Sequence, residues 1–256
     1  MEMIEGAASP TGITALPPRS AADQRRFERN FFLTVAFAFP LIVLIGFGPT
    51  YYAKGFFNTP AVPSFLVHVH GLVMSAWVVL FISQVLMIRT MRVKTHQRSG
   101  MAAIALAIAI FVIGLWTGVA SAQRGGGVPG IPPLSFLIVP VGDVLVFAVL
   151  FAAAVYYRRN PANHKRLMLL TVINFLPPAI GRFPGGMTEA FGPLWFYGVP
   201  GALTIFLLAA DTWRNRKLNK VFLAASIFLI ASQWIRLAVA GGEPWLAIAR
   251  WMTGVS

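Results

Sequence analysis

Long apolar stretches alternate with short polar ones along almost the whole chain. Each stretch is close to the roughly 20 residues that a helix needs to cross a hydrocarbon layer. Seven of them are predicted to be membrane-spanning helices, at residues 31–48, 64–88, 101–121, 134–157, 167–181, 193–210 and 221–240. Because the connections are short, consecutive helices are expected to be antiparallel neighbours. The pattern therefore predicts an all-α fold, a seven-transmembrane-helix bundle over residues 31–240.

The two ends of the chain differ from this membrane domain. Residues 1–30 are polar and contain prolines among small residues, which predicts a disordered cytoplasmic arm. Residues 241–256 predict a short periplasmic or interfacial tail. Inside the fifth predicted span, the consecutive Pro177 and Pro178 remove two backbone donors, so this span is expected to be broken or strongly kinked.

Basic residues fix the expected orientation of the spans. Their numbers before, between and after the seven stretches alternate between four and one, from the N-terminus to the last predicted span. The groups of four lie within residues 19–29, 89–98, 158–166 and 214–220, and the single residues are Lys54, Arg124 and Arg182. Cytoplasmic loops retain Lys and Arg during insertion. The alternation therefore predicts a cytoplasmic N-terminus and a periplasmic C-terminus.

Composition narrows the class of protein and of partner. The chain is 57% hydrophobic and 11% charged, which is too apolar for an ordinary soluble domain. The net charge of +13 lies mostly in the predicted cytoplasmic turns, so the expected partner is a lipid bilayer with anionic headgroups and not nucleic acid. With no Cys, the chain can form neither an iron-sulfur cluster nor a covalently attached haem.

Ionisable residues at membrane depth mark the candidate site, because they are costly in hydrocarbon. Once the topology is assigned, most of them fall in the outer half of the bundle. The residues expected to line a polar pocket there are His68, His70, Asp143, Arg182, Gln233 and Arg236. Gln84 and Asn174 are the notable polar residues expected in the inner half. A buried ion pair of Asp143 with Arg236 or Arg182 that binds nothing is the structural alternative.

Two metal or haem sites remain open as alternatives. His70, Met74 and Asp143 are residue types that can hold a transition metal, although they have no recognised spacing. His68 cannot join His70 at one ion, because residues two apart on a helix point about 200 degrees apart. A b-type haem needs two His on different helices at one depth, and His96 and His164 meet this condition.

The sequence also resembles known groups of membrane proteins. The segments around His68 and His70, Gly142 and Asp143, His164 to Leu170, Pro178 to Arg182, and Ser232 to Arg236 look like a group of uncharacterised seven-span bacterial inner-membrane proteins. The His-then-basic turns distantly resemble the DUF2306 type and the DUF420 type, the latter linked to terminal-oxidase assembly. The resemblance implies a bacterial inner membrane and supplies no activity.

The leading hypothesis is a membrane protein whose outer-half pocket binds or moves a small polar or anionic ligand. Arg182 and Arg236 would supply the charge complementarity, and His70 would add sensitivity to pH. A haem or metal protein acting in redox chemistry or assembly is the first alternative. An enzyme acting on a lipid or quinone, with His70 and Asp143 as acid and base, is the second.

Overall fold

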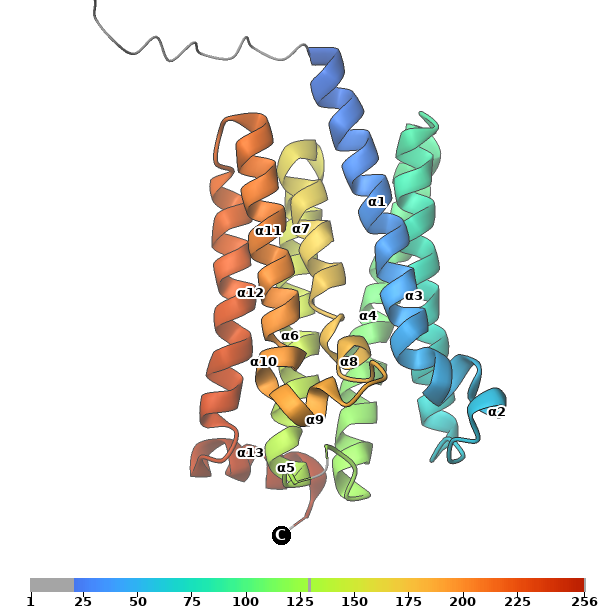
Figure 1. Cartoon of the computed structure of the whole chain (residues 1–256), viewed down its shortest axis with the longest axis vertical. Coiled ribbons are helices and arrows are strands. Elements are labelled where there is room, and N and C mark those ends of the chain that lie inside the picture. Colours follow the sequence, from blue (N-terminus) through green and yellow to red (C-terminus); the bar gives the residue numbers. More distant parts are fainter. Residues whose placement is uncertain (1–20, 129, 256) are drawn as a thin grey trace, which may run out of the picture.

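The computed structural model describes residues 21–128 and 130–255, and in that part of the chain every regular element is helical. The long helices run back and forth between the two ends of one bundle (Figure 1). They are α1 (Ala21–Phe47), α3 (Phe65–Arg89), α4 (Val93–Gln123), α6 (Ile138–Tyr156), α7 (Pro161–Ile173), α11 (Gly198–Asn215) and α12 (Lys220–Val239). The shorter elements are η1 (Gly48–Tyr52), α2 (Lys54–Phe57), α5 (Pro133–Phe136), η2 (Tyr157–Arg159), α8 (Pro177–Ile180), α9 (Met187–Phe191), α10 (Pro193–Phe196) and α13 (Glu243–Thr253).

Six helical segments of the described chain are long and apolar enough to cross a membrane, which identifies a multi-pass membrane protein. They correspond to six of the seven predicted spans. The exception is the predicted span 167–181, which forms two shorter helices, α7 and α8, separated by residues 174–176. The break falls directly before Pro177, where the missing N–H and the bulk of the ring prevent the helix from continuing.

The first helix is longer than the predicted first span. α1 begins at Ala21, so residues 21–30 of the predicted disordered arm are helical. Residues 1–20, the rest of that arm, lie outside the described residues. At its other end α1 continues into the wider helical turn η1 and the short α2, both at the opposite end of the bundle (Figure 1).

The basic turns gather at one end of the molecule. The start of α1 and the α3–α4, α6–α7 and α11–α12 connections all lie at the top of Figure 1, whereas η1, α2, α5 and α13 lie at the other end. This shared end is the one that the charge pattern predicts to be cytoplasmic.

α7 is the central helix of the bundle. It packs against α6, α11 and α12, and its residues from Arg166 to Ile173 are buried apart from Met168. A helix that is buried on every side needs no polar stripe. Two of the polar residues on α7, Arg166 and Thr171, therefore have partners inside the protein: Arg166 binds Asp211 of α11, and the Thr171 hydroxyl donates to the Met168 carbonyl.

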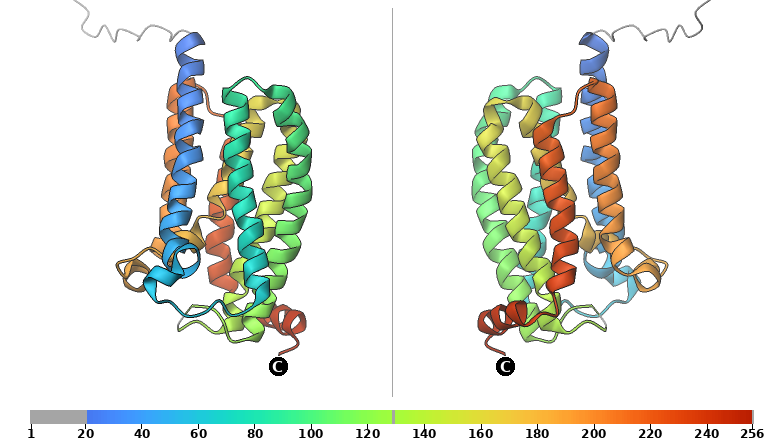
Figure 2. Two further views of the ribbon diagram at one scale, coloured as in Figure 1. Left: turned by 90° about the vertical axis from the view of Figure 1, so that its right-hand side faces the viewer. Right: turned by 90° about the vertical axis from the view of Figure 1, so that its left-hand side faces the viewer.

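α13 lies across the end of the bundle that is opposite the basic turns (Figure 2). Trp245 Nε1 donates a hydrogen bond to the Leu134 carbonyl at 2.9 Å, and Gln123 Nε2 donates to the Thr253 carbonyl at 2.8 Å. Ile248 and Trp251 on the same helix are exposed. An amphipathic helix with an outward tryptophan is suited to the interface between membrane and water.

Candidate functional site

A buried ion pair joins α6 to α12. Arg236 Nη1 lies 2.7 Å from Asp143 Oδ1, and both residues are less than a tenth exposed. The same Nη1 donates to the Val139 carbonyl at 3.0 Å, and Arg236 Nε donates to the Ser232 carbonyl at 3.0 Å. The guanidinium is therefore held in one orientation by both helices. Of the two arginines that the sequence offered to Asp143, the structure pairs it with Arg236.

Gly142 makes room for this arginine. A Cβ at residue 142 would overlap Arg236 Cδ and crowd its Nη1 and Nε atoms. The absence of a side chain at Gly142 thus lets the guanidinium lie directly against the backbone of α6. The observed geometry of the ion pair therefore depends on glycine at residue 142.

Two further residues reach the ion pair from breaks between helices. Asn174 lies between α7 and α8, and its Nδ2 donates to the Asp143 carbonyl at 2.8 Å. Tyr197 lies between α10 and α11, is fully buried, and has its ring centroid 5.6 Å from the Arg236 guanidinium carbon. This distance suits a cation–π contact. Asn174, which was not among the residues expected to line the pocket, is thus joined to the backbone of Asp143.

Gln233 lies one turn before Arg236 on the same buried face of α12. Within the described structure, several buried polar atoms around the ion pair have no hydrogen-bond partner. They are Asn174 Oδ1, Tyr197 OH, both Gln233 amide atoms and Arg236 Nη2. Buried polar groups in proteins are nearly always paired with protein, water or ligand. We call Asp143, Asn174, Tyr197, Gln233 and Arg236 the polar centre.

Arg182 lies elsewhere. It follows α8, is exposed, and donates from Nη1 to the Pro178 carbonyl at 2.7 Å. Its guanidinium carbon is 4.7 Å from the centre of the Phe47 ring, at the end of α1. Arg182 therefore helps to join α8 to α1, and the ion pair of Asp143 is made without it.

The paired histidines of α3 face different neighbours. The His68 ring centroid lies 5.8 Å from that of Tyr51, and Gly71 leaves the space that the Tyr51 ring fills. Tyr52 and Ser75 share a hydrogen bond of 2.7 Å one turn further along. His68 is thus on the face of α3 that meets the end of α1. His70, two residues further along α3, is half-buried.

The candidate metal ligands His70, Met74 and Asp143 have separate surroundings. Met74 packs in the apolar cluster around Trp77 and Phe147, and Asp143 is engaged by Arg236 and Asn174. Across residues 21–128 and 130–255, no three His, Asp or Glu side chains lie close enough together to hold a metal ion.

His96 and His164 come together at the end of the bundle that carries the basic turns. Their ring centroids are 6.4 Å apart and their planes are inclined by 81°. His164 Nδ1 lies 2.8 Å from the Ala154 carbonyl, which leaves its Nε2 available. His96 Nδ1 and the nearby Gln84 Oε1 are buried without a hydrogen-bond partner in the structure as described. Two imidazoles on different helices are thus held at one depth.

Sequence comparison adds nothing to these two sites. No protein-family model matches the chain, and searches among curated proteins and among solved structures give no match. The function therefore has to be inferred from the geometry of the sites.

Proposed function

We propose that this multi-pass membrane protein binds a small polar or anionic molecule at the polar centre. The observation that carries the proposal is the set of unpaired polar atoms around Arg236. An ion pair with a purely structural role would have its remaining donors satisfied by the protein, because unpaired buried groups are costly. Arg236 Nη2 and both polar atoms of the Gln233 amide have no partner among the described residues, and in our proposal they bind the ligand.

The chemistry of these atoms defines the class of guest. Arg236 Nη2, Gln233 Nε2 and Tyr197 OH are donors, which suits an anionic or strongly accepting oxygen. Asn174 Oδ1 and Gln233 Oε1 are acceptors, which suits a hydroxyl or amine on the same molecule. A small molecule with a carboxylate group and a hydroxyl or amino group would bind both the donor atoms and the acceptor atoms of the polar centre.

The helix breaks support transport of the bound molecule in this proposal. Asn174 and Tyr197 both lie where one helix ends and another begins, and discontinuous helices around a central polar site are typical of transporters. In our proposal the α7–α8 segment completes a seventh crossing of a bacterial inner membrane. The basic turns are then cytoplasmic, and the polar centre is reached from the periplasmic half.

The test is a thermal-unfolding screen of the purified protein with small carboxylates, hydroxy acids, amino acids and inorganic oxyanions. At least one compound is expected to raise the unfolding temperature of the wild type and not that of Gln233→Leu or Tyr197→Phe. Arg250→Gln is the matched control, because Arg250 pairs with Glu243 on exposed α13. The proposal fails if no compound stabilises the wild type, or if the two site variants respond as the wild type does.

The His96–His164 pair supports a second candidate, a b-type haem or another His-ligated metal. Two imidazoles that hold one ion from opposite sides, with metal–nitrogen bonds of about 2 Å, have centroids about 6 Å apart. The observed 6.4 Å agrees with this arrangement. A backbone carbonyl on the second ring nitrogen, as at His164, is the usual support of a metal-ligating His.

Absorption spectroscopy and elemental analysis distinguish this candidate. A Soret band or stoichiometric metal is expected in the wild type and in His68→Ala, and is expected to disappear in His164→Ala. A colourless, metal-free protein purified from cells supplied with haem and copper would rule it out.

A further inference from the structure

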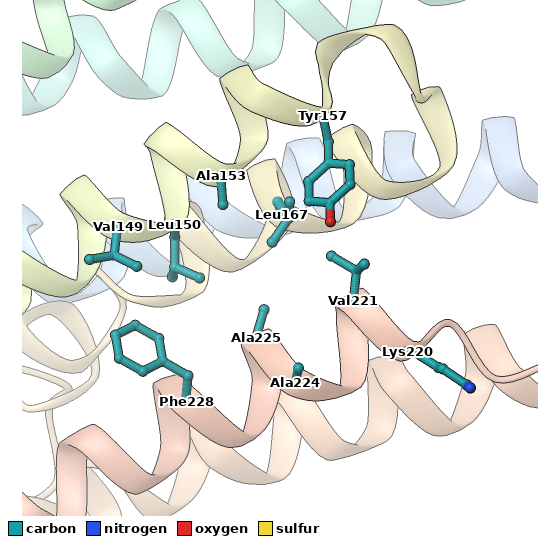
Figure 3. Close-up of a pocket in the computed structure, with 10 residues that line it drawn as sticks. All are labelled: Val149, Leu150, Ala153, Tyr157, Leu167, Lys220, Val221, Ala224, Ala225 and Phe228. Carbon is teal, nitrogen blue, oxygen red and sulfur yellow. The ribbon is translucent and has the colours of Figure 1, made fainter.

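A groove of about 410 Å³ runs along the surface of the bundle between α6, α7 and α12. Figure 3 shows its lining, which is apolar along most of its length. The residues that line it are Val149, Leu150, Ala153, Tyr157, Leu167, Lys220, Val221, Ala224, Ala225 and Phe228.

Small side chains create the hollow. Ala153 on α6 and the consecutive Ala224 and Ala225 on α12 leave space between helices that pack closely elsewhere. Polar contacts join the α12 segment to its neighbours, α6 and α7, on either side of the hollow. Arg236 binds Asp143 at one end, and at the other Asn219 Nδ2 donates to Asn163 Oδ1 of α7 at 2.8 Å. The hollow therefore lies between two polar contacts of the α12 segment, one with α6 and one with α7.

The polar groups of the groove are at one end. Tyr157 follows α6 and Lys220 opens α12, and both lie at the end of the bundle that carries the basic turns (Figures 1 and 3). Arg158, Arg159, Arg216 and Lys217 occupy the adjoining turns. From Tyr157 to Val149 the groove follows eight residues of helix, about 12 Å. One leaflet of hydrocarbon is about 15 Å deep.

We infer that this groove holds one acyl chain of an anionic phospholipid, with the phosphate at Lys220. The apolar length lies on the outside of membrane-spanning helices, where the surrounding molecules are lipids. The Lys220 ammonium group lies at the end of the groove where a lipid headgroup would be, and its positive charge is complementary to a phosphate. The inference is independent of the polar centre.

Native mass spectrometry of the full-length protein with phosphatidylglycerol and with phosphatidylcholine tests the inference. The wild type is expected to retain phosphatidylglycerol in preference. Lys220→Gln is expected to weaken phosphatidylglycerol binding about fivefold and leave phosphatidylcholine binding unchanged. Ala224→Phe, which fills the groove, is expected to abolish the retained adduct of either lipid.

Two control variants separate the groove from the rest of the surface. Lys94→Gln changes an exposed basic residue at the start of α4, a helix that does not line the groove, and Ala105→Phe adds a ring to the exposed face of the same helix. Both are expected to bind lipid as the wild type does. Equal retention of the two lipids, an adduct that survives Ala224→Phe, or a dimer that only Ala224→Phe dissociates would each overturn the inference.

Discussion

Arg236 reaches from α12 to Asp143 on α6 and binds it at 2.7 Å, while its second terminal nitrogen has no hydrogen-bond partner among the described residues. Two of the three guanidinium nitrogens are thus hydrogen-bonded within the protein, and the third is not. Its Nη1 and Nε atoms bind Asp143 and two backbone carbonyls, whereas Nη2, like the Gln233 amide atoms and the Tyr197 hydroxyl, has no hydrogen-bond partner among the described residues. In our proposal Nη1 and Nε hold the side chain in the fold and Nη2 binds the ligand.

Removing either partner of this ion pair is expected to destabilise the protein strongly. Asp143→Leu and Arg236→Met each leave an uncompensated charge in the interior, at a cost of about 3–5 kcal/mol. The double variant is expected to be more stable than either single variant. Unfolding in detergent by denaturant, analysed as a double-mutant cycle, measures this coupling. Strictly additive losses would show that the pair contributes nothing as a pair.

Gly142→Ala tests the close approach of Arg236 to α6. The added methyl group overlaps Arg236 Cδ, so the side chain must move and the ion pair must lengthen. We expect a loss of about 1–3 kcal/mol, typical of overpacking. Gly201→Ala is the control, because a Cβ there meets no atom within 4 Å and alanine favours the helix. If both substitutions have the same effect, the proposed crowding at Gly142 is wrong.

Gln233→Leu is expected to leave the ligand-free protein as stable as the wild type or more so. The amide has no partner in the described structure, so its replacement by an apolar side chain removes a buried polar group and breaks no hydrogen bond. The unfolding temperature without added compounds measures this effect. A large loss of stability would mean that the Gln233 amide is engaged in the fold after all, and that the polar centre is closed.

A second buried ion pair should be sensitive to the shape of its cation. Arg166 on α7 binds Asp211 on α11 through two nitrogens, at 2.9 and 2.7 Å. Arg166→Lys keeps the charge and loses the two-pronged geometry. We expect it to lower the unfolding temperature clearly, whereas Arg250→Gln in an exposed pair should change stability by about 1 kcal/mol or less. A stable Arg166→Lys variant would contradict this.

The absence of Cys makes the topology easy to test. Thr90→Cys, in the α3–α4 turn, is expected to resist a membrane-impermeant maleimide in whole cells and to react after lysis. Ala61→Cys, in the connection before α3 at the opposite end, is expected to react in intact cells with a permeabilised outer membrane. Labelling of Thr90→Cys in such intact cells would contradict the orientation that the basic residues predict.

Much of the fold could be predicted from hydropathy, because a backbone in hydrocarbon must satisfy its own hydrogen bonds. The break before Pro177 was also predictable from the missing donors. Which residues come together at the polar centre could not be predicted in this way. Sequence gives each residue a depth, and Arg182 and Arg236 have similar expected depths. Which helix faces which neighbour decides that Arg236 meets Asp143 and that Arg182 meets Phe47.

Tyr197 was missed for a related reason. An isolated tyrosine in an apolar stretch carries no signal of its own, and only the packing of the α10–α11 junction against α12 brings its ring to Arg236. Asn174 was noticed as a polar residue but not assigned to the pocket, because its contact with the backbone of Asp143 depends on how α7 packs against α6.

Isothermal titration of the most stabilising compound into the wild type and Gln233→Leu tests the central claim most directly. We predict saturable binding at one site in the wild type and an affinity at least about tenfold weaker in Gln233→Leu, as expected when a hydrogen bond to a charged group is lost. Arg250→Gln should bind as the wild type does. Equal affinities in all three proteins would contradict the claim that the polar centre is the binding site.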